Sequence, residues 1–375
     1  MIKTGHLGKR ELLALSVIAS IADVSLFYPQ QLVLQGSSAG WMIPLFSMLI
    51  TLGVWALAGP VFAREKKEDL ITLCEKTLGR FAARTMCVVI AVYMMLDMVT
   101  LSRTFTEAVV TTVLPRSPIS FVAVPFFLTV AYCAWKGLEG LSRLALVFWS
   151  WLAVGLGALL VLNLNWMRPD KIFPILGFGV TPLLTGSGLF LSVFVNLLVL
   201  TLFGSRLRKQ EELRTMGFLS IIAIGMTYLL VTLVFVIVFS PEAAMRSPFP
   251  LYQLGRLIYI GRFIQRLEAA FVFIWVVMAV LKMATTLLIS TYLFATVFRM
   301  PVFRPLVAST ALIVFALSFY TRSFVETIAF NNKYIVTWSW AVVVGIPLLV
   351  ATAVRFKRRK EEREHEEAQR SADAS

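Results

Sequence analysis

A few ionisable residues interrupt long apolar stretches of this sequence, and they are the side chains that could do chemistry there. Asp23 lies in the middle of an apolar run over residues 12–34, and Pro29 follows it six residues later. Asp97 and Lys282 lie inside two other apolar runs. Ionisable groups at such depth line a cavity, pair with one another or relay protons. The chemistry they predict is therefore the binding of a small charged ligand or the movement of protons.

Pro29 interrupts the hydrogen-bond pattern of the first run. It cannot donate a backbone hydrogen bond and it crowds the preceding turn, so we expect the helix to open around residues 25–28, beside Asp23. Broken helices in matching positions of two inverted halves build a site at the middle of a membrane. The run in the matching position, TPLLTGSGLFLSVFVNLLVLTLFGSR, has Asn196 as its strongly polar interior residue, and its outer part contains the loosening residues Pro182, Gly186, Ser187 and Gly188. The alternative is that Pro29 only kinks a helix.

Two pairs of opposite charges are spaced four residues apart. Arg103 and Glu107 share one helix face, as do Glu139 and Arg143, so an ion pair along each helix is the simplest interpretation. Asp97 lies six residues before Arg103 and deeper in the run, without a partner on its own helix. It is the better candidate for lining a cavity or relaying protons.

Lys282 shares a long apolar run with Glu268. The fourteen residues between them place both side chains on about the same helix face but ~21 Å apart along the axis, too far for an ion pair. Lys282 is followed by Thr285 and Thr286, which makes a polar cluster deep in the run. This cluster either meets a partner on another helix or faces a cavity.

Metal and nucleophile chemistry have few residues to use. Cys74, Cys87 and Cys133 have no paired spacing, and the two histidines, His6 and His365, lie at opposite ends of the chain. Neither a zinc site nor a disulfide framework is indicated. A Ser–His–Asp or Cys–His arrangement has almost nothing to be built from, so we expect no enzyme activity, no metal and no cofactor.

The elements that must position these residues are membrane helices. The chain has 375 residues, of which 58% are hydrophobic and 15% charged, and its mean hydropathy is +0.81. Uninterrupted apolar runs of membrane-spanning length exclude a β-barrel, and the first run lacks a signal-peptide cleavage site, so we expect it to be retained. An all-α membrane protein with ten helices is predicted, at about 12–34, 40–62, 85–113, 118–135, 142–163, 187–204, 214–240, 267–298, 303–320 and 335–354.

The basic residues predict the orientation. Of the 35 Lys and Arg residues, 24 fall on the side of the two termini and 8 on the opposite side, so both termini are expected in the cytoplasm. The net charge of +14 then reflects topology and attraction to anionic lipid, and no nucleic-acid partner is expected. Residues 355–375 form a charged cytoplasmic tail, either solvated as a helix or disordered end, or docked to a partner.

The sequence resembles the endospore germination permease family, the B subunits of bacterial spore germinant receptors within the amino acid–polyamine–organocation superfamily. The similar stretches are KRELLALSVIASIADVSLFYPQQL, SRTFTEAVVTTVLPRSP, YCAWKGLEGLSRLALVF and GRFIQRLEAAFVFIWVVMAVLK, in matching order and spacing. The resemblance implies a LeuT-like five-plus-five inverted repeat, here about 8–163 and 180–354 within a membrane domain over 1–354. It also implies an amino acid or similar nutrient as ligand, an A-subunit membrane protein and a C-subunit lipoprotein as partners, and the spore inner membrane as location.

The resemblance places the ligand cavity among helices 1, 3, 6 and 8. Candidate lining residues are Ala22, Asp23, Val24, Ser25, Tyr93, Asp97, Ser192, Asn196, Trp275 and Thr285. Candidate structural or coupling charges are Arg103, Glu107, Glu139, Arg143, Glu268 and Lys282, and the Gly-Leu-Glu after helix 4 corresponds to Gly137, Leu138 and Glu139.

Two departures from the family pattern bear on the ligand. Many relatives have glycine where helix 1 unwinds, whereas this chain has Ala22, so the break is expected nearer Tyr28 and Pro29. In helix 6 the chain reads Phe-Val-Asn-Leu over 194–197 where relatives often have Pro, Gly or an acid, which leaves Asp23 as the charge for a ligand amine. Two functions remain open: a nutrient-sensing receptor subunit, or a proton-coupled amino acid transporter that uses Asp97, Glu107 or Lys282.

Overall fold

The computed structural model describes residues 8–65, 68–207, 209–258 and 268–373, and these form helices joined by short turns. The first half contains α1 (Lys9–Ile21), η1 (Ala22–Ser25), α2 (Tyr28–Gly36), η2 (Ser37–Ala39), α3 (Met42–Arg64), α4 (Leu70–Leu78), α5 (Arg80–Thr112), α6 (Ile119–Leu162), η3 (Leu164–Trp166) and η4 (Pro169–Ile172). The second half contains α7 (Val180–Leu189), η5 (Phe190–Leu197), α8 (Leu198–Phe203), η6 (Gly204–Arg206), α9 (Glu212–Phe239), α10 (Pro241–Arg246), α11 (Pro250–Leu257), α12 (Glu268–Val297), α13 (Arg304–Ser318), α14 (Phe324–Phe330), η7 (Asn331–Val336), η8 (Ala341–Gly345) and α15 (Ile346–Asp373).

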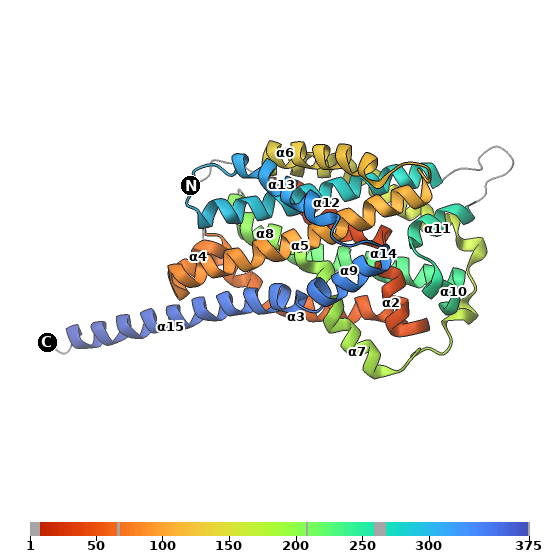
Figure 1. Ribbon diagram of the computed structural model, residues 1–375. Helices are drawn as coiled ribbons and strands as arrows, with labels where there is room; N and C mark the ends of the chain where they lie inside the picture. Colours follow the sequence, from red (N-terminus) through yellow and green to blue (C-terminus); the bar gives the residue numbers. More distant parts are fainter. Residues whose placement is uncertain (1–7, 66–67, 208, 259–267, 374–375) are drawn as a thin grey trace.

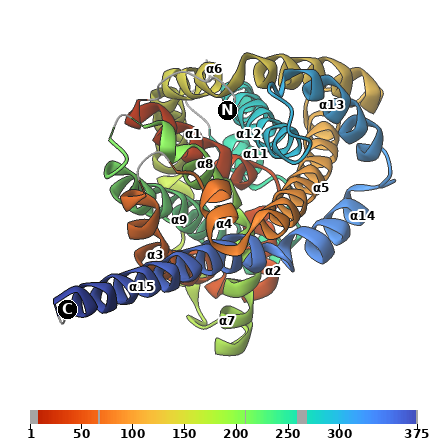
Figure 2. The same ribbon diagram turned by 90° about the vertical axis from the view of Figure 1, so that its left-hand side faces the viewer.

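The long helices run side by side in one bundle (Figures 1 and 2). The helix α12 packs against α5 and α6, and α3 packs along α9. The interrupted first helix lies inside this bundle, where α1 contacts α6, α9, α12 and η5. Every side chain of α1 from Ala14 to Ile21 is buried, because the helix is surrounded by protein. Polar groups on this helix are therefore shielded from both lipid and water.

Helices 1 and 6 are both discontinuous, as the sequence predicted. α1 ends at Ile21, the 3₁₀ turn η1 follows, and α2 starts at Tyr28 with a bend of 65°. The opening thus begins three residues before the predicted 25–28 segment and does not wait for Pro29. Pro29 lies in the first turn of α2, where a missing backbone N–H leaves no bond unmade.

The break in helix 6 lies deeper than the sequence indicated. The predicted loosening residues Pro182, Gly186, Ser187 and Gly188 all belong to the regular helix α7. The irregular segment is η5, an eight-residue 3₁₀ stretch that contains Asn196. Pro182 lies in the first turn of α7, where proline is tolerated, and Gly186, Ser187 and Gly188 lie in its last turn without interrupting it. Their presence therefore did not locate the break.

The number of spans is only partly settled by helix length. Seven helices among the described residues are long and apolar enough to span a membrane, and eight are if the bent pair α1–α2 counts as one. Two predicted runs, 118–135 and 142–163, both fall within α6, which turns at Gly137 with a φ of 85° that favours glycine. The ninth run corresponds to α13, which has only 15 residues, so the count of ten stays a prediction.

Both described ends of the chain lie at one end of the bundle, called here the α4 end (Figure 1). Lys9 at the start of α1 pairs with Glu212 at the start of α9, and Arg358 of α15 pairs with Glu65 after α3. The tail continues α15 as a helix to Asp373, and its residues 355–367 are exposed. It projects beyond the bundle (Figure 1), and whether it is solvated or docked to a partner stays a prediction. The opposite end, which carries α10 and α11, is called the α11 end.

Candidate binding site at the helix breaks

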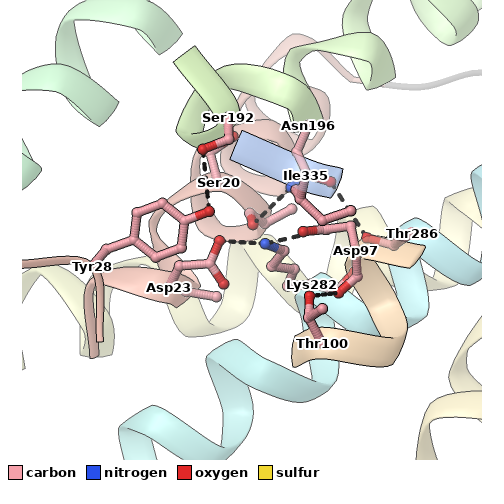
Figure 3. A network of polar contacts seen from close by, with 12 residues as sticks. Ser20, Asp23, Tyr28, Asp97, Thr100, Ser192, Asn196, Lys282, Thr286 and Ile335 are labelled. Atoms are coloured by element: carbon pink, nitrogen blue, oxygen red, sulfur yellow. Dashed lines mark hydrogen bonds and ion pairs between the residues drawn. The ribbon is translucent and has the colours of Figure 1, made fainter. Parts of the chain in front are cut away.

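Three charged side chains from three different elements meet at the centre of the bundle (Figure 3). The Nζ atom of Lys282 on α12 forms an ion pair with Oδ2 of Asp23 in η1, and it lies 3.4 Å from Oδ2 of Asp97 on α5. The exposed fractions of the three residues are 2% for Lys282, 3% for Asp23 and 6% for Asp97. We call this group the triad. The sequence left open whether the polar cluster around Lys282 meets a partner on another helix or faces a cavity. The structure shows a partner on another helix.

The triad has one more acid than base. When all three groups are ionised, the two carboxylates and the ammonium group together carry a net charge of −1 in a site removed from water. Burying charge is expensive unless the groups are paired with good geometry. Oδ2 of Asp97 has no hydrogen-bond partner among the described residues, because its 3.4 Å contact with Lys282 lacks hydrogen-bond geometry. The site is therefore built to hold positive charge, and Asp97 is the less satisfied of its two acids.

The unwound turn η1 is what brings Asp23 to this position. Leu26 donates its backbone N–H to the carbonyl of Asp23, at 3.1 Å, and the hydroxyl of Ser25 donates to the carbonyl of Ala22, at 2.6 Å. These local bonds satisfy part of the backbone that a regular helix would have used. Val24 lies fully buried in the same turn. All four predicted residues of the helix 1 break thus form one turn beside α12.

A ring of neutral polar groups ties the two broken helices together. The hydroxyls of Tyr28 and Ser192 are 3.1 Å apart, which joins α2 to η5. Asn196 donates through Nδ2 to the carbonyl of Ala19, at 3.2 Å, and its Oδ1 accepts from the Thr286 hydroxyl at 3.5 Å. The breaks of helices 1 and 6 therefore share hydrogen bonds around the triad, as Figure 3 shows.

The π-helical stretch η7 closes another side of the site. Tyr93, one turn before Asp97 on α5, donates its hydroxyl to the carbonyl of Ile335 at 2.9 Å. Ile335 belongs to η7, a π-helical stretch, and such stretches shift the regular hydrogen-bond register and often occur at functional sites. Thr100 also donates to Oδ1 of Asn331 in η7, at 3.3 Å.

Aromatic rings pack together towards the α11 end. The rings of Phe324 and Phe249 have centroids 5.2 Å apart, and Phe324 also meets Phe27 at 6.5 Å. Trp275 belongs to this layer, since it lies 5.6 Å from Phe105 and 6.3 Å from Phe249. Its indole N–H has no partner among the described residues. Trp275 lies on α12, the helix that carries Lys282, but its ring packs in the aromatic layer, so its role in ligand binding stays a prediction.

The predicted ion pair of Arg103 and Glu107 is present and does more than link two turns. Nε of Arg103 lies 3.2 Å from Oε2 of Glu107. Arg103 also donates to the carbonyl of Arg322 at 3.2 Å, and Glu107 accepts the backbone N–H of Phe324 at 3.0 Å. The pair therefore holds the linker between α13 and α14 against α5.

Replacing Glu107 with glutamine is expected to lower the free energy of unfolding by about 1–3 kcal/mol, because it leaves the buried guanidinium of Arg103 without its carboxylate. Glu139→Gln is the matched control, since Glu139 and Arg143 form the other predicted pair in an exposed position. An exposed pair contributes about 0–1 kcal/mol. Denaturant unfolding of the purified variants in detergent measures both changes. Equal shifts would show that the linker contacts add nothing.

The remaining predicted residues have mixed positions. Thr285 is buried but donates to the carbonyl of Leu281 on its own helix, at 2.7 Å, so its direct part in a site stays a prediction. Glu268 starts α12, and its side chain lies outside the described residues. The candidate lining residues did not include Tyr28, which adjoins Pro29, or Thr286, which the sequence placed only in the polar cluster around Lys282. The position next to Pro29 and the four-residue spacing from Lys282 were the sequence features that could have pointed to these two residues.

Two interrupted helices that cross at a buried polar site are the architecture of secondary transporters. A solved structure with a similar fold is that of Mhp1, a nucleobase-cation-symport-1 family transporter in a closed conformation with bromovinylhydantoin bound. It matches with a TM-score of 0.64 at 12% sequence identity, covering 91% of this chain and 77% of that chain. The similarity shows the fold, so the protein has the LeuT-like, all-helical transporter fold of a multi-pass membrane protein.

The family follows from the sequence match. The family model described as spore germination protein matches residues 6–325, so this chain belongs to the spore germination protein family. One curated relative is spore germination protein KB of Bacillus subtilis (strain 168), 25% identical over 199 residues. That alignment covers 52% of this chain and 52% of the relative, so it spans about half the length of the relative.

Proposed function

We propose that this protein binds a small nutrient that carries an amine, an amino acid in the first instance, as the membrane subunit of a spore germinant receptor. The observation that carries the proposal is the triad, which offers an excess negative charge at the point where helices 1 and 6 open. The family membership supports the role in germination. The protein then acts in the spore inner membrane with both termini in the cytoplasm, beside an A-subunit membrane protein and a C-subunit lipoprotein.

In this proposal the two ends of an amino acid meet opposite charges. Its ammonium group lies at Asp23, with Asp97 close by. Its carboxylate lies near the start of α2, which has no side-chain cap and where the helix dipole favours negative charge. The hydroxyls of Tyr28 and Ser192 border that start. Inverted halves at about 8–163 and 180–354 move around this site when the ligand binds.

A second function is supported by the fold and by the intramembrane acids. The protein is then a proton-coupled amino acid transporter, with Asp97 or Glu107 carrying the proton. A transporter and a receptor can use the same site, because both need a ligand-dependent change between two conformations.

The decisive experiment uses spores whose only germinant receptor contains this subunit. We expect one or a few amino acids from a panel to trigger germination. Vesicles that contain the purified subunit are tested in parallel for uptake of the same labelled amino acids down a proton gradient. Uptake by vesicles together with spores that respond to no nutrient would establish the transporter and exclude the receptor.

A further inference from the structure

The position of Lys282 raises the question of how any ligand could reach the acids of the triad. The side chain of Lys282 is among the largest that are fully buried in the described part of the chain. Its ammonium group contacts both carboxylates, and neither acid is more than 6% exposed. A ligand amine therefore reaches Asp23 only if the surrounding protein moves, and Lys282 is the side chain that already occupies the Asp23 carboxylate.

The ammonium group of Lys282 and the ammonium group of an amino acid ligand have the same chemistry. A lysine ammonium is a compact cation with three rotatable donors on a flexible four-carbon stem, and the ammonium group of an amino acid presents the same charge and donors. Asp23 cannot distinguish them by charge. The lysine differs in being attached to α12, so it is always present at the site.

The two acids differ in how firmly they hold Lys282. Its contact with Asp23 is a hydrogen-bonded ion pair, whereas its contact with Asp97 is 3.4 Å long and lacks hydrogen-bond geometry. If a ligand ammonium takes Asp23, Lys282 can close on Asp97. Each acid then has one cation, and the net charge of the site changes from −1 to zero, which a site of low dielectric favours.

We infer that Asp23 and Asp97 form an alkylammonium-binding site whose resident occupant is Lys282, and that a ligand amine activates the protein by displacing Lys282 from Asp23 onto Asp97. The exchange breaks the link between η1 and α12, two elements that pack together. This inference rests on the proposed function in one respect, because it requires that the natural ligand carries an amine. Lys282 then acts as a built-in competitor that sets the ligand concentration needed for a response.

The test is chemical replacement of the lysine side chain. Lys282→Ala deletes the atoms of n-propylammonium, so we titrate the purified variant in detergent with n-propylammonium and follow its thermal unfolding temperature. The expected result is a dose-dependent rise in that temperature, at concentrations at least tenfold lower than any effect on the wild type. Propan-1-ol has a similar size without charge and should have no such effect. Lys333→Ala, which removes an exposed lysine, is the matched control and should behave like the wild type.

A second variant keeps the test decisive if Lys282→Ala does not fold. Lys282→Ala/Asp97→Asn removes one acid together with the lysine, so the site keeps its net charge of −1 and leaves Asp23 for the added amine. Adding Asp23→Asn to that variant should abolish its response to n-propylammonium.

The inference is overturned if neither variant responds, if propan-1-ol works equally well, or if the wild type responds at the same concentrations. These outcomes are independent of the germination panel. A panel that identifies a nutrient while the amine has no effect would leave the proposed function standing and remove only the competitor role of Lys282.

Discussion

Replacing Lys282 with methionine is expected to destabilise the protein more than any other single substitution in the triad, by about 3–5 kcal/mol. Methionine has nearly the length of lysine, so the change removes charge with little loss of packing. It leaves the carboxylates of Asp23 and Asp97 buried together with no cation, and the net charge of the site becomes −2. Denaturant unfolding of the purified protein in detergent measures the loss, and the amount of folded protein in membranes gives an independent reading.

The control for this prediction is to remove an acid as well. Asp97→Asn alone reduces the net charge of the site from −1 to zero and should cost less, about 1–3 kcal/mol for the altered hydrogen bonding. The double variant Lys282→Met/Asp97→Asn should regain much of the stability that Lys282→Met loses, because it no longer buries two uncompensated acids. A double variant that is as unstable as the sum of the two single changes would mean that the triad is not electrostatically coupled.

Asp23→Asn is expected to raise the nutrient concentration needed for germination by about 10- to 100-fold. The substitution removes the carboxylate proposed to bind the ligand ammonium, and a hydrogen bond to a charged group contributes about 1.5–3 kcal/mol. The fold should persist, because Lys282 retains Asp97 as its counter-ion. The measurement is the dose–response of spores carrying the variant, together with the amount of subunit in their membranes.

Asp97→Asn is the matched control for that result, since it removes the same charge from the neighbouring position. In the proposed arrangement the ligand contacts Asp23, and Asp97 only receives the displaced lysine, so the shift in dose–response should be smaller. If Asp97→Asn has the larger effect while both subunits accumulate normally, the amine site lies at Asp97 and the roles assigned to the two acids are reversed.

Residues close together in the sequence were predicted well. The break beside Asp23 and the ion pairs of Arg103 with Glu107 and of Glu139 with Arg143 all depend on neighbours within one or two helical turns. Two details were wrong: helix 1 opens at Ala22, three residues before the predicted 25–28 segment, and the break in helix 6 lies deeper than predicted. Its 3₁₀ segment η5 is apolar except for Ser192 and Asn196 and contains no proline or glycine, and the segment is held by contacts with α1, α3 and α9. No local signal marks it.

The sequence by itself determined that the chain is a membrane protein made of helices, that helix 1 opens near an acid, and that Asp97 and Lys282 are too deep to be surface charges. Apolar run length, backbone chemistry and helical spacing are local properties, so they can be read without a fold. Only the tertiary structure decided that Lys282 meets Asp23, 259 residues away, with Asp97 beside them. That meeting depends on how η1, α5 and α12 pack, and packing is fixed by side-chain shape across the whole bundle.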